Sequence, residues 1–157
     1  MKFRDRAILF VASGCYIGMI PIAPGTFGSL IGLAVCFLLS RLSFPQSVVW
    51  VLIIVFFAVA IASAAEKILN QKDPGQIVID EIAGIAVTFV GLPFNLKTAL
   101  AGFIIFRVID IVKPFPIRAL ERRVRGGTGV VLDDILAGVY GNLAIRLAIY
   151  LTSMYLN

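Results

Sequence analysis

The stretch SVVWVLIIVFFAVAIASAA, residues 47–65, decides the fold class of this chain. It runs for nineteen positions without a charged side chain, close to the ~20 apolar residues that a helix needs to cross a bilayer. Its β-branched residues do not indicate a strand, because strands rarely exceed about eight residues. The stretch therefore predicts a membrane-crossing helix.

Five further apolar segments surround this helix, at residues 7–20, 28–42, 78–92, 98–112 and 133–152. The 157 residues are 60% hydrophobic, above the roughly 45–50% of soluble domains, and the mean hydropathy is +1.00. We expect an all-α integral membrane protein. The segments predict a compact bundle of about five to six short membrane helices, forming a single domain over residues 1–157.

The first apolar segment is too short to cross a bilayer easily, since it has only 14 residues before Pro21. Its basic start resembles a signal peptide, but PIAPGTFGS and another apolar run follow it, which is more typical of structure than of a cleavage site. We expect an interfacial or re-entrant helix. If the segment crosses instead, only the N-terminus changes side.

Lysine and arginine set the expected orientation, because they concentrate in cytoplasmic loops. With a first helix that does not cross, the N-terminus and the loops at 21–27, 66–77 and 113–132 share one side. That side holds ten basic residues, and the other loops hold only Arg41 and Lys97. The ten are Lys2, Arg4, Arg6, Lys67, Lys72, Lys113, Arg118, Arg122, Arg123 and Arg125. The richer side is therefore expected to face the cytoplasm.

Composition also limits the chemistry of the chain. The net charge of +5 lies in short loops between apolar segments, which is typical of contact with anionic lipid headgroups rather than with nucleic acid. The absence of histidine excludes phosphohistidine intermediates, imidazole bases and histidine-bound zinc. Cys15 and Cys36 lie in apolar runs and are expected to be small hydrophobic residues. Chemistry must come from carboxylates, hydroxyls, lysine, arginine and bound metal.

Two acidic doublets are the main candidates for that chemistry. Asp80 and Glu81 stand at the start of one apolar segment, and Asp133 and Asp134 at the start of another. Helix N-termini favour carboxylates, so capping is one explanation. Two acids on each of two helices, with Asp73 and Asp110 nearby, exceed what capping needs, and a bound cation would relieve their repulsion. Ligation by oxygen alone suits Mg²⁺ or Mn²⁺.

Basic and glycine-rich motifs could bind an anion on the same side. In FRVIDIVKP, residues 106–114, Arg107, Asp110 and Lys113 share roughly one helix face. Arg107 and Lys113 could bind phosphate, or Asp110 could simply neutralise both cations. The glycines of APGTFGS and RGGTG could bring backbone N–H groups to an anion, or only form turns. Neither motif is a Walker loop, so ATP binding is not expected.

Four ordered motifs resemble one known family. PGTFGS (24–29), IVIDEIAG (77–84), FRVIDIVKPFPI (106–117) and GGTGVVLDDILAG (126–138) are similar, in order and spacing, to the bacterial phosphatidylglycerophosphatase A family over residues 21 to 145. The resemblance implies a Mg²⁺-dependent lipid phosphatase of the inner membrane that converts phosphatidylglycerophosphate to phosphatidylglycerol. It implies active-site roles for two groups of residues. These are the acids Asp80, Glu81, Asp133 and Asp134, and the cluster of Arg107, Asp110 and Lys113.

On this basis we expect a site facing the cytoplasm, with the lipid tails in the bilayer. The expected metal ligands are Asp80, Asp133 and Asp134, with Glu81 as a further ligand or as the base for water. Asp110 completes the expected catalytic acids. The expected phosphate-binding residues are Arg107, Lys113, Thr26 and Ser29.

Other functions remain open from sequence alone. They are an ion or solute transporter, a non-catalytic helper subunit, and another lipid phosphotransferase or pyrophosphatase. The partners expected are a phosphorylated glycerophospholipid and membrane lipids, and a homo-oligomer is left open.

Overall fold

The computed structural model describes residues 1–124 and 126–156, without the side chains of Arg122 and Leu156. Arg125, one of the basic residues used above for orientation, therefore lies outside the described residues. Within these ranges the chain forms helices and no strand, which confirms the all-α prediction. The helices are α1 (Phe3–Ala12), the short 3₁₀ helix η1 (Ile17–Met19), α2 (Pro24–Leu39), α3 (Phe44–Leu69), α4 (Ile79–Thr88), α5 (Leu96–Val112), α6 (Ile117–Arg123) and α7 (Gly127–Leu156).

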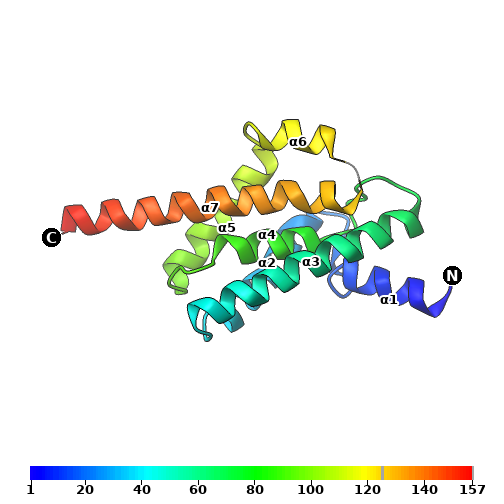
Figure 1. Ribbon diagram of the computed structural model, residues 1–157, viewed down its shortest axis with the longest axis horizontal. Coiled ribbons are helices and arrows are strands. Elements are labelled where there is room, and N and C mark those ends of the chain that lie inside the picture. Colours follow the sequence, from blue (N-terminus) through cyan, green and yellow to red (C-terminus); the bar gives the residue numbers. More distant parts are fainter. Residues whose placement is uncertain (125, 157) are drawn as a thin grey trace.

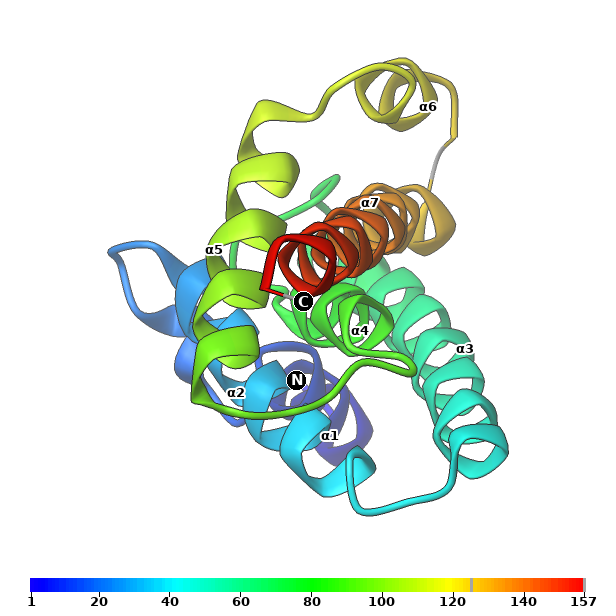
Figure 2. The ribbon, with the colours of Figure 1, turned by 90° about the vertical axis from the view of Figure 1, so that its left-hand side faces the viewer.

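Helix α4 is the centre of the bundle. It packs most extensively against α7 and α2, and it also contacts α3 and α5, so that the other helices surround it (Figure 2). Most of its residues are buried, including Asp80 in its first turn. A helix of only ten residues is thus the most enclosed part of the bundle.

Glycine allows α4 and α7 to approach closely. A Cβ on Gly84 would lie 2.6 Å from the carbonyl oxygen of Asp134, and a Cβ on Gly138 would overlap the carbonyl oxygen of Gly84. On the other side of α4, a Cβ on Gly28 of α2 would lie 2.7 Å from Cβ of Val78. Small residues at helix crossings are typical of membrane bundles, because they let backbones meet. Gly84 and Gly138 are therefore packing positions between α4 and α7.

Two helices are long and apolar enough to cross a membrane, α3 and α7. Only 22% of the most apolar 18-residue stretch of each helix is buried, and Leu52 and Phe56 on α3 and Leu143 on α7 are exposed. A core helix of a soluble protein would bury such residues. The C-terminal part of α7 extends beyond the other helices, and the two termini lie at opposite ends of the long axis (Figure 1).

Three boundaries differ from the sequence prediction. Helix α1 ends at Ala12, because Gly14, Cys15 and Tyr16 take up left-handed backbone angles that stop a helix. The 113–132 region, expected to be a loop, contains α6, whose Ile117 is fully buried. Helix α7 begins at Gly127 rather than near Asp133, since Gly127 packs tightly against Ser63 of α3. The helices therefore number more than the five to six expected, and α3 and α7 are not short.

Candidate active site

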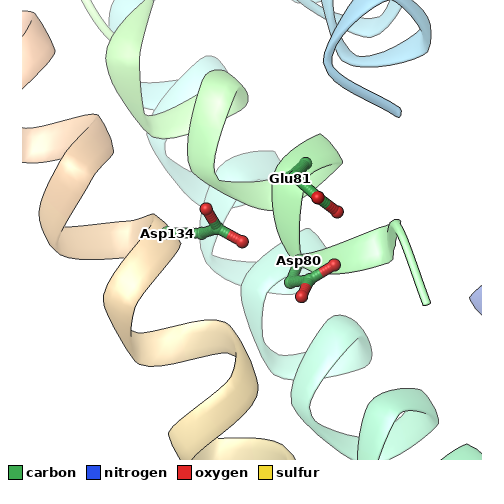
Figure 3. A group of neighbouring side chains, drawn as sticks. All are labelled: Asp80, Glu81 and Asp134. Atoms are coloured by element: carbon green, nitrogen blue, oxygen red, sulfur yellow. The ribbon is translucent and has the colours of Figure 1, made fainter. Parts of the chain in front are cut away.

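Three carboxylates meet where α4 begins beside α7. One oxygen from each of Asp80, Glu81 and Asp134 lies within 4.8 Å of the others (Figure 3). Asp80 and Glu81 come from the first turn of α4, and Asp134 comes from α7. Asp80 and Asp134 are only 6% and 3% exposed, so two of these acids are withdrawn from water. We call these three residues the acidic cluster.

Capping does not explain the acidic cluster. The first four backbone N–H groups of α7 belong to residues 127–130, so Asp134 lies beyond the free N–H groups. The sequence prediction that Asp133 and Asp134 open a helix is wrong, because the helix begins six residues earlier. The free N–H groups at the start of α4 do stabilise the negative charges of Asp80 and Glu81. The start of α7 does not stabilise Asp134 in this way, because the effect of a helix terminus falls off within the first turn.

The acidic cluster fits a divalent cation. Oδ1 of Asp80, Oε2 of Glu81 and Oδ1 of Asp134 are buried without a hydrogen-bond partner in the described part of the chain. A buried charged oxygen without a partner is strongly destabilising, and three together also repel one another. A cation bound between them would remove both costs. Carboxylate oxygens without histidine or cysteine are the donor set that suits Mg²⁺ and Mn²⁺.

Arg107 of α5 lies beside the acidic cluster. Its Nη1 is 2.7 Å from Oδ2 of Asp110, one turn further along α5, and 3.9 Å from Oε1 of Glu81. The Nε atom of Arg107 is buried and has no hydrogen-bond partner among residues 1–124 and 126–156. Asp110 thus fixes one edge of the guanidinium group, and a donor on another edge is left for an anion.

Lys113 forms a second charged group at the end of α5. It caps the helix with a left-handed backbone, and its Nζ contacts Oδ2 of Asp133 and lies 3.2 Å from Oε1 of Glu121 on α6. Burial alone would lower the pKa of the Lys113 ammonium group, but the hydrogen bonds to Asp133 and Glu121 outweigh burial and raise the pKa above its ordinary value. Lys113 therefore stays charged at neutral pH.

The two acids of the α7 doublet point to different partners. Asp134 joins the acidic cluster, and Asp133 pairs with Lys113. Neighbouring residues on a helix point about 100° apart, which explains the division. Asp133 is also not fully satisfied, because its Oδ1 is buried without a hydrogen-bond partner in the described residues. In the described part of the chain Asp110 forms an ion pair with Arg107 and not with Lys113, so the alternative that it neutralises both cations is not realised.

The start of α2 borders the same site. A Cβ on Gly25 would overlap Oε1 of Glu81 and lie 3.0 Å from Nη1 of Arg107, so any larger residue there would displace these two side-chain ends. Ser29 is buried, and its hydroxyl donates to the carbonyl of Gly25 at 2.8 Å; Thr26 is partly buried in the first turn. The other glycine-rich motif lies elsewhere, since Gly127 packs on α3 and Gly126 is exposed.

Three polar residues make contacts with this framework that sequence reasoning did not predict. Glu121 was hidden in the charged ERRVR stretch, where nothing distinguishes a buried partner from a solvated acid. Asn142 and Arg146 of α7 bind backbone carbonyls at the end of α4 and just beyond it. An arginine inside an apolar segment was the one available signal, because such residues are costly in a membrane.

Comparisons with known proteins agree on one family. Residues 10–149 match the model of a family described as Phosphatidylglycerophosphatase A. A protein of that name from Escherichia coli K12 is 38% identical over 82% of this chain and 76% of its own length. Another of that name, from Haemophilus influenzae Rd, is 32% identical over 88% of this chain and 86% of its own length.

A third relative carries a different name. A protein from Bacteroides thetaiotaomicron, provisionally named a phosphatidylinositol-3-phosphatase, is 34% identical over 94% of this chain and 97% of its own length. No solved structure matches the chain.

Proposed function

The chain belongs to the phosphatidylglycerophosphatase A family, and from this premise we propose that it is a Mg²⁺-dependent enzyme that hydrolyses phosphatidylglycerophosphate to phosphatidylglycerol and phosphate. The observation that carries the proposal is the acidic cluster of unpartnered buried carboxylates, with Arg107 beside it and Lys113 paired to Asp133, the chain neighbour of Asp134. This combination of cation ligands and phosphate donors is what phosphoryl transfer needs.

Asp80, Glu81 and Asp134 hold the cation in this proposal. A bound Mg²⁺ would neutralise charge on the phosphate oxygens and lower the pKa of a coordinated water. Asp133 remains a proposed ligand through its free Oδ1, with Lys113 occupying its other oxygen.

Arg107 and Lys113 bind the substrate phosphate. Arg107 is held by Asp110 with its Nε unpartnered, so the group is oriented before substrate arrives. Lys113 is charged and held between Asp133 and Glu121, and it can share its protons with a phosphate oxygen. Thr26 and the backbone at Gly25 line the same side and would contact the remaining oxygens, with Ser29 behind them.

Glu81 is the proposed base. Its Oε1 faces Arg107, while the side chain also belongs to the acidic cluster, so Glu81 connects the phosphate-binding Arg107 to the other two cation ligands, Asp80 and Asp134. The oxygen of a water molecule attacks phosphorus and loses a proton to Glu81. The bond from phosphorus to the glycerol oxygen breaks, and that oxygen takes up a proton from solvent water to leave as the alcohol of phosphatidylglycerol, while Glu81 returns its proton to solvent.

We further propose that the chain is a single membrane-embedded domain in the bacterial inner membrane, with the site facing the cytoplasm. Helices α3 and α7 support membrane insertion by length and exposed apolar surface. The excess of lysine and arginine in the loops on the side of the acidic cluster supports the orientation. Helix α1, with ten residues and about 15 Å of rise, is too short to cross and would lie at the interface.

The Bacteroides relative supports a second candidate substrate, phosphatidylinositol 3-phosphate. Both lipids carry a phosphomonoester on a glycerophospholipid headgroup, and the acidic cluster and Arg107 recognise that shared group. The two substrates differ in the alcohol that is released, which is phosphatidylglycerol in one case and phosphatidylinositol in the other.

Phosphate release by detergent-purified protein tests the proposal. Wild type should release phosphate from phosphatidylglycerophosphate with Mg²⁺ and not with chelator, and faster than from phosphatidylinositol 3-phosphate. Folded Asp80→Asn and Asp134→Asn variants should lose about 10²-fold or more in kcat, because each removes a charged ligand. Near-normal rates in both variants would refute the site. Faster hydrolysis of phosphatidylinositol 3-phosphate would make that lipid, rather than phosphatidylglycerophosphate, the proposed substrate.

A further inference from the structure

The far end of α4 presents a problem that the active site does not explain. α4 has ten residues, so it rises only about 15 Å from the acidic cluster before it ends at Thr88. In the proposed orientation that end lies about halfway across the roughly 30 Å hydrocarbon core. The last carbonyl groups of a helix have no helical partner, and lipid offers them no hydrogen bond.

Two side chains of α7 bind the last carbonyl group of α4, that of Thr88, and the carbonyl groups of Val90 and Gly91 just beyond the helix. Nδ2 of Asn142 donates to the carbonyls of Thr88 at 2.8 Å and Val90 at 2.9 Å. Nη2 of Arg146 donates to the carbonyls of Val90 at 2.9 Å and Gly91 at 3.3 Å. Nε of Arg146 also donates to Oδ1 of Asn142 at 2.7 Å, which orients the amide. We call Asn142 and Arg146 the clamp.

The clamp and the acidic cluster are built on the same two helices. Asp134, Gly138 and Asn142 follow one another at intervals of four residues, so they share the face of α7 that packs on α4. Asp134 meets the beginning of α4, Gly138 meets Gly84 in its middle, and the clamp meets its end. α4 is thus fixed to α7 along its whole length.

We propose that Asn142 and Arg146 are positioning residues for the cation site, which set the register of α4 on α7 and hence the spacing of Asp80 and Glu81 from Asp134. The inference rests on the proposed function through the cation that these acids bind. A slip of α4 by one residue would move Asp80 by about 1.5 Å relative to Asp134. Metal sites need their ligands within about 0.5 Å of the working geometry, so such a slip would disable the site.

The clamp is specific to this geometry. An apolar side chain could cover the end of α4 without fixing its position. Hydrogen-bond donors held in place on α7 instead determine where the backbone carbonyls at the end of α4 lie. A lysine at position 146 could not donate to Asn142 and to two carbonyls together, because its single ammonium group lacks the planar fork of arginine. Arg146→Lys is therefore a conservative change in charge that should still disturb the register.

Mn²⁺ binding, measured by electron paramagnetic resonance on the full chain in detergent, tests the inference without relying on activity. Asn142→Leu, which keeps the size and removes the donors, should weaken Mn²⁺ binding about 10-fold or more per folded protein. Its kcat should fall by a similar factor with KM for the lipid unchanged, because the phosphate-binding groups on α5 are untouched. Arg146→Lys should act in the same direction.

Thr152→Val is the matched control. Thr152 is exposed on the same helix, and its hydroxyl donates only to the carbonyl of Ala148, so Mn²⁺ affinity and kcat should match wild type. If Asn142→Leu does not fold, Asn142→Gln, which retains the amide one methylene further out, and Arg146→Lys take its place under the same criterion.

The outcomes separate the two proposals. Folded clamp variants with wild-type Mn²⁺ affinity and kcat would overturn the positioning role and leave the proposed function intact. A wild-type protein that hydrolyses the lipid but does not bind Mn²⁺ would refute the cation site, and the positioning role with it.

Discussion

Gly84→Ala tests the close approach of α4 and α7 beside the acidic cluster. The new Cβ would lie 2.6 Å from the carbonyl oxygen of Asp134 and 2.8 Å from the ring of Phe106. Ordinary contact begins at about 3.4 Å, so one helix must shift by about 0.8 Å. Both neighbours resist the shift, because one is backbone and Phe106 is fully buried.

The expected effect on activity is larger than the effect on stability. Overpacking destabilises by about 1–3 kcal/mol, while replacing helical glycine with alanine returns about 1 kcal/mol, so the net change in unfolding free energy is small. A displacement of nearly 1 Å between catalytic groups can reduce the rate by about 10²-fold. We expect kcat to fall by about that factor while the protein remains folded.

Gly141→Ala provides the control for this prediction. Gly141 lies on α7 seven residues, or about two turns, beyond Asp134. A Cβ added to Gly141 would come no closer than 3.2 Å to any neighbour, the methyl group of Thr88. Its kcat should remain within about 3-fold of wild type, since a small shift there does not reach the ligands. The assay is phosphate release from phosphatidylglycerophosphate at saturating Mg²⁺, with thermal unfolding in the same detergent. Equal kcat values for the two alanine variants would refute the reasoning.

Three further predictions concern charged groups. Arg107→Lys should lower kcat by about 10²-fold in the phosphate-release assay, because an ammonium group cannot bind Asp110 and phosphate as a fork does; full activity would exclude the role. Lys113→Met should lower phosphate release by a similar factor, and an unchanged rate would show that Lys113 is only structural. Glu121→Gln should change kcat by less than about 5-fold in the same assay, since Lys113 retains Asp133; a loss as large as that of Lys113→Met would contradict this.

Patterns that depend on the local sequence were predictable. Residues 47–65 identified α3, because a long apolar run has few alternatives to a helix, and the structure extends it to Phe44–Leu69. Its N-terminus lies where Ser43 and Gln46 form a capping box, and Asn70 ends it with a left-handed backbone. Small residues in apolar helices are also a local signal of helix crossings, and Gly84 and Gly138 lie at one, although the sequence does not say which helices cross there.

Features that depend on tertiary contacts were not predictable. The GGTG stretch reads as a turn, and only packing of Gly127 on α3 extends α7 through it. The sequence could not say which acid of the α7 doublet faces α4, because that depends on how α7 is rotated in the bundle. The clamp was missed for a related reason: its acceptors are backbone carbonyls, which leave no mark in the side-chain pattern.

The central claim is that Asp80, Glu81 and Asp134 hold a divalent cation at the beginning of α4. The most direct test is an anomalous difference map from crystals of the active protein grown with Mn²⁺. We predict one strong peak within about 2.0–2.6 Å of a carboxylate oxygen from each of the three residues. A peak that none of these three residues touches, from crystals whose protein hydrolyses the lipid with Mn²⁺, would contradict the account.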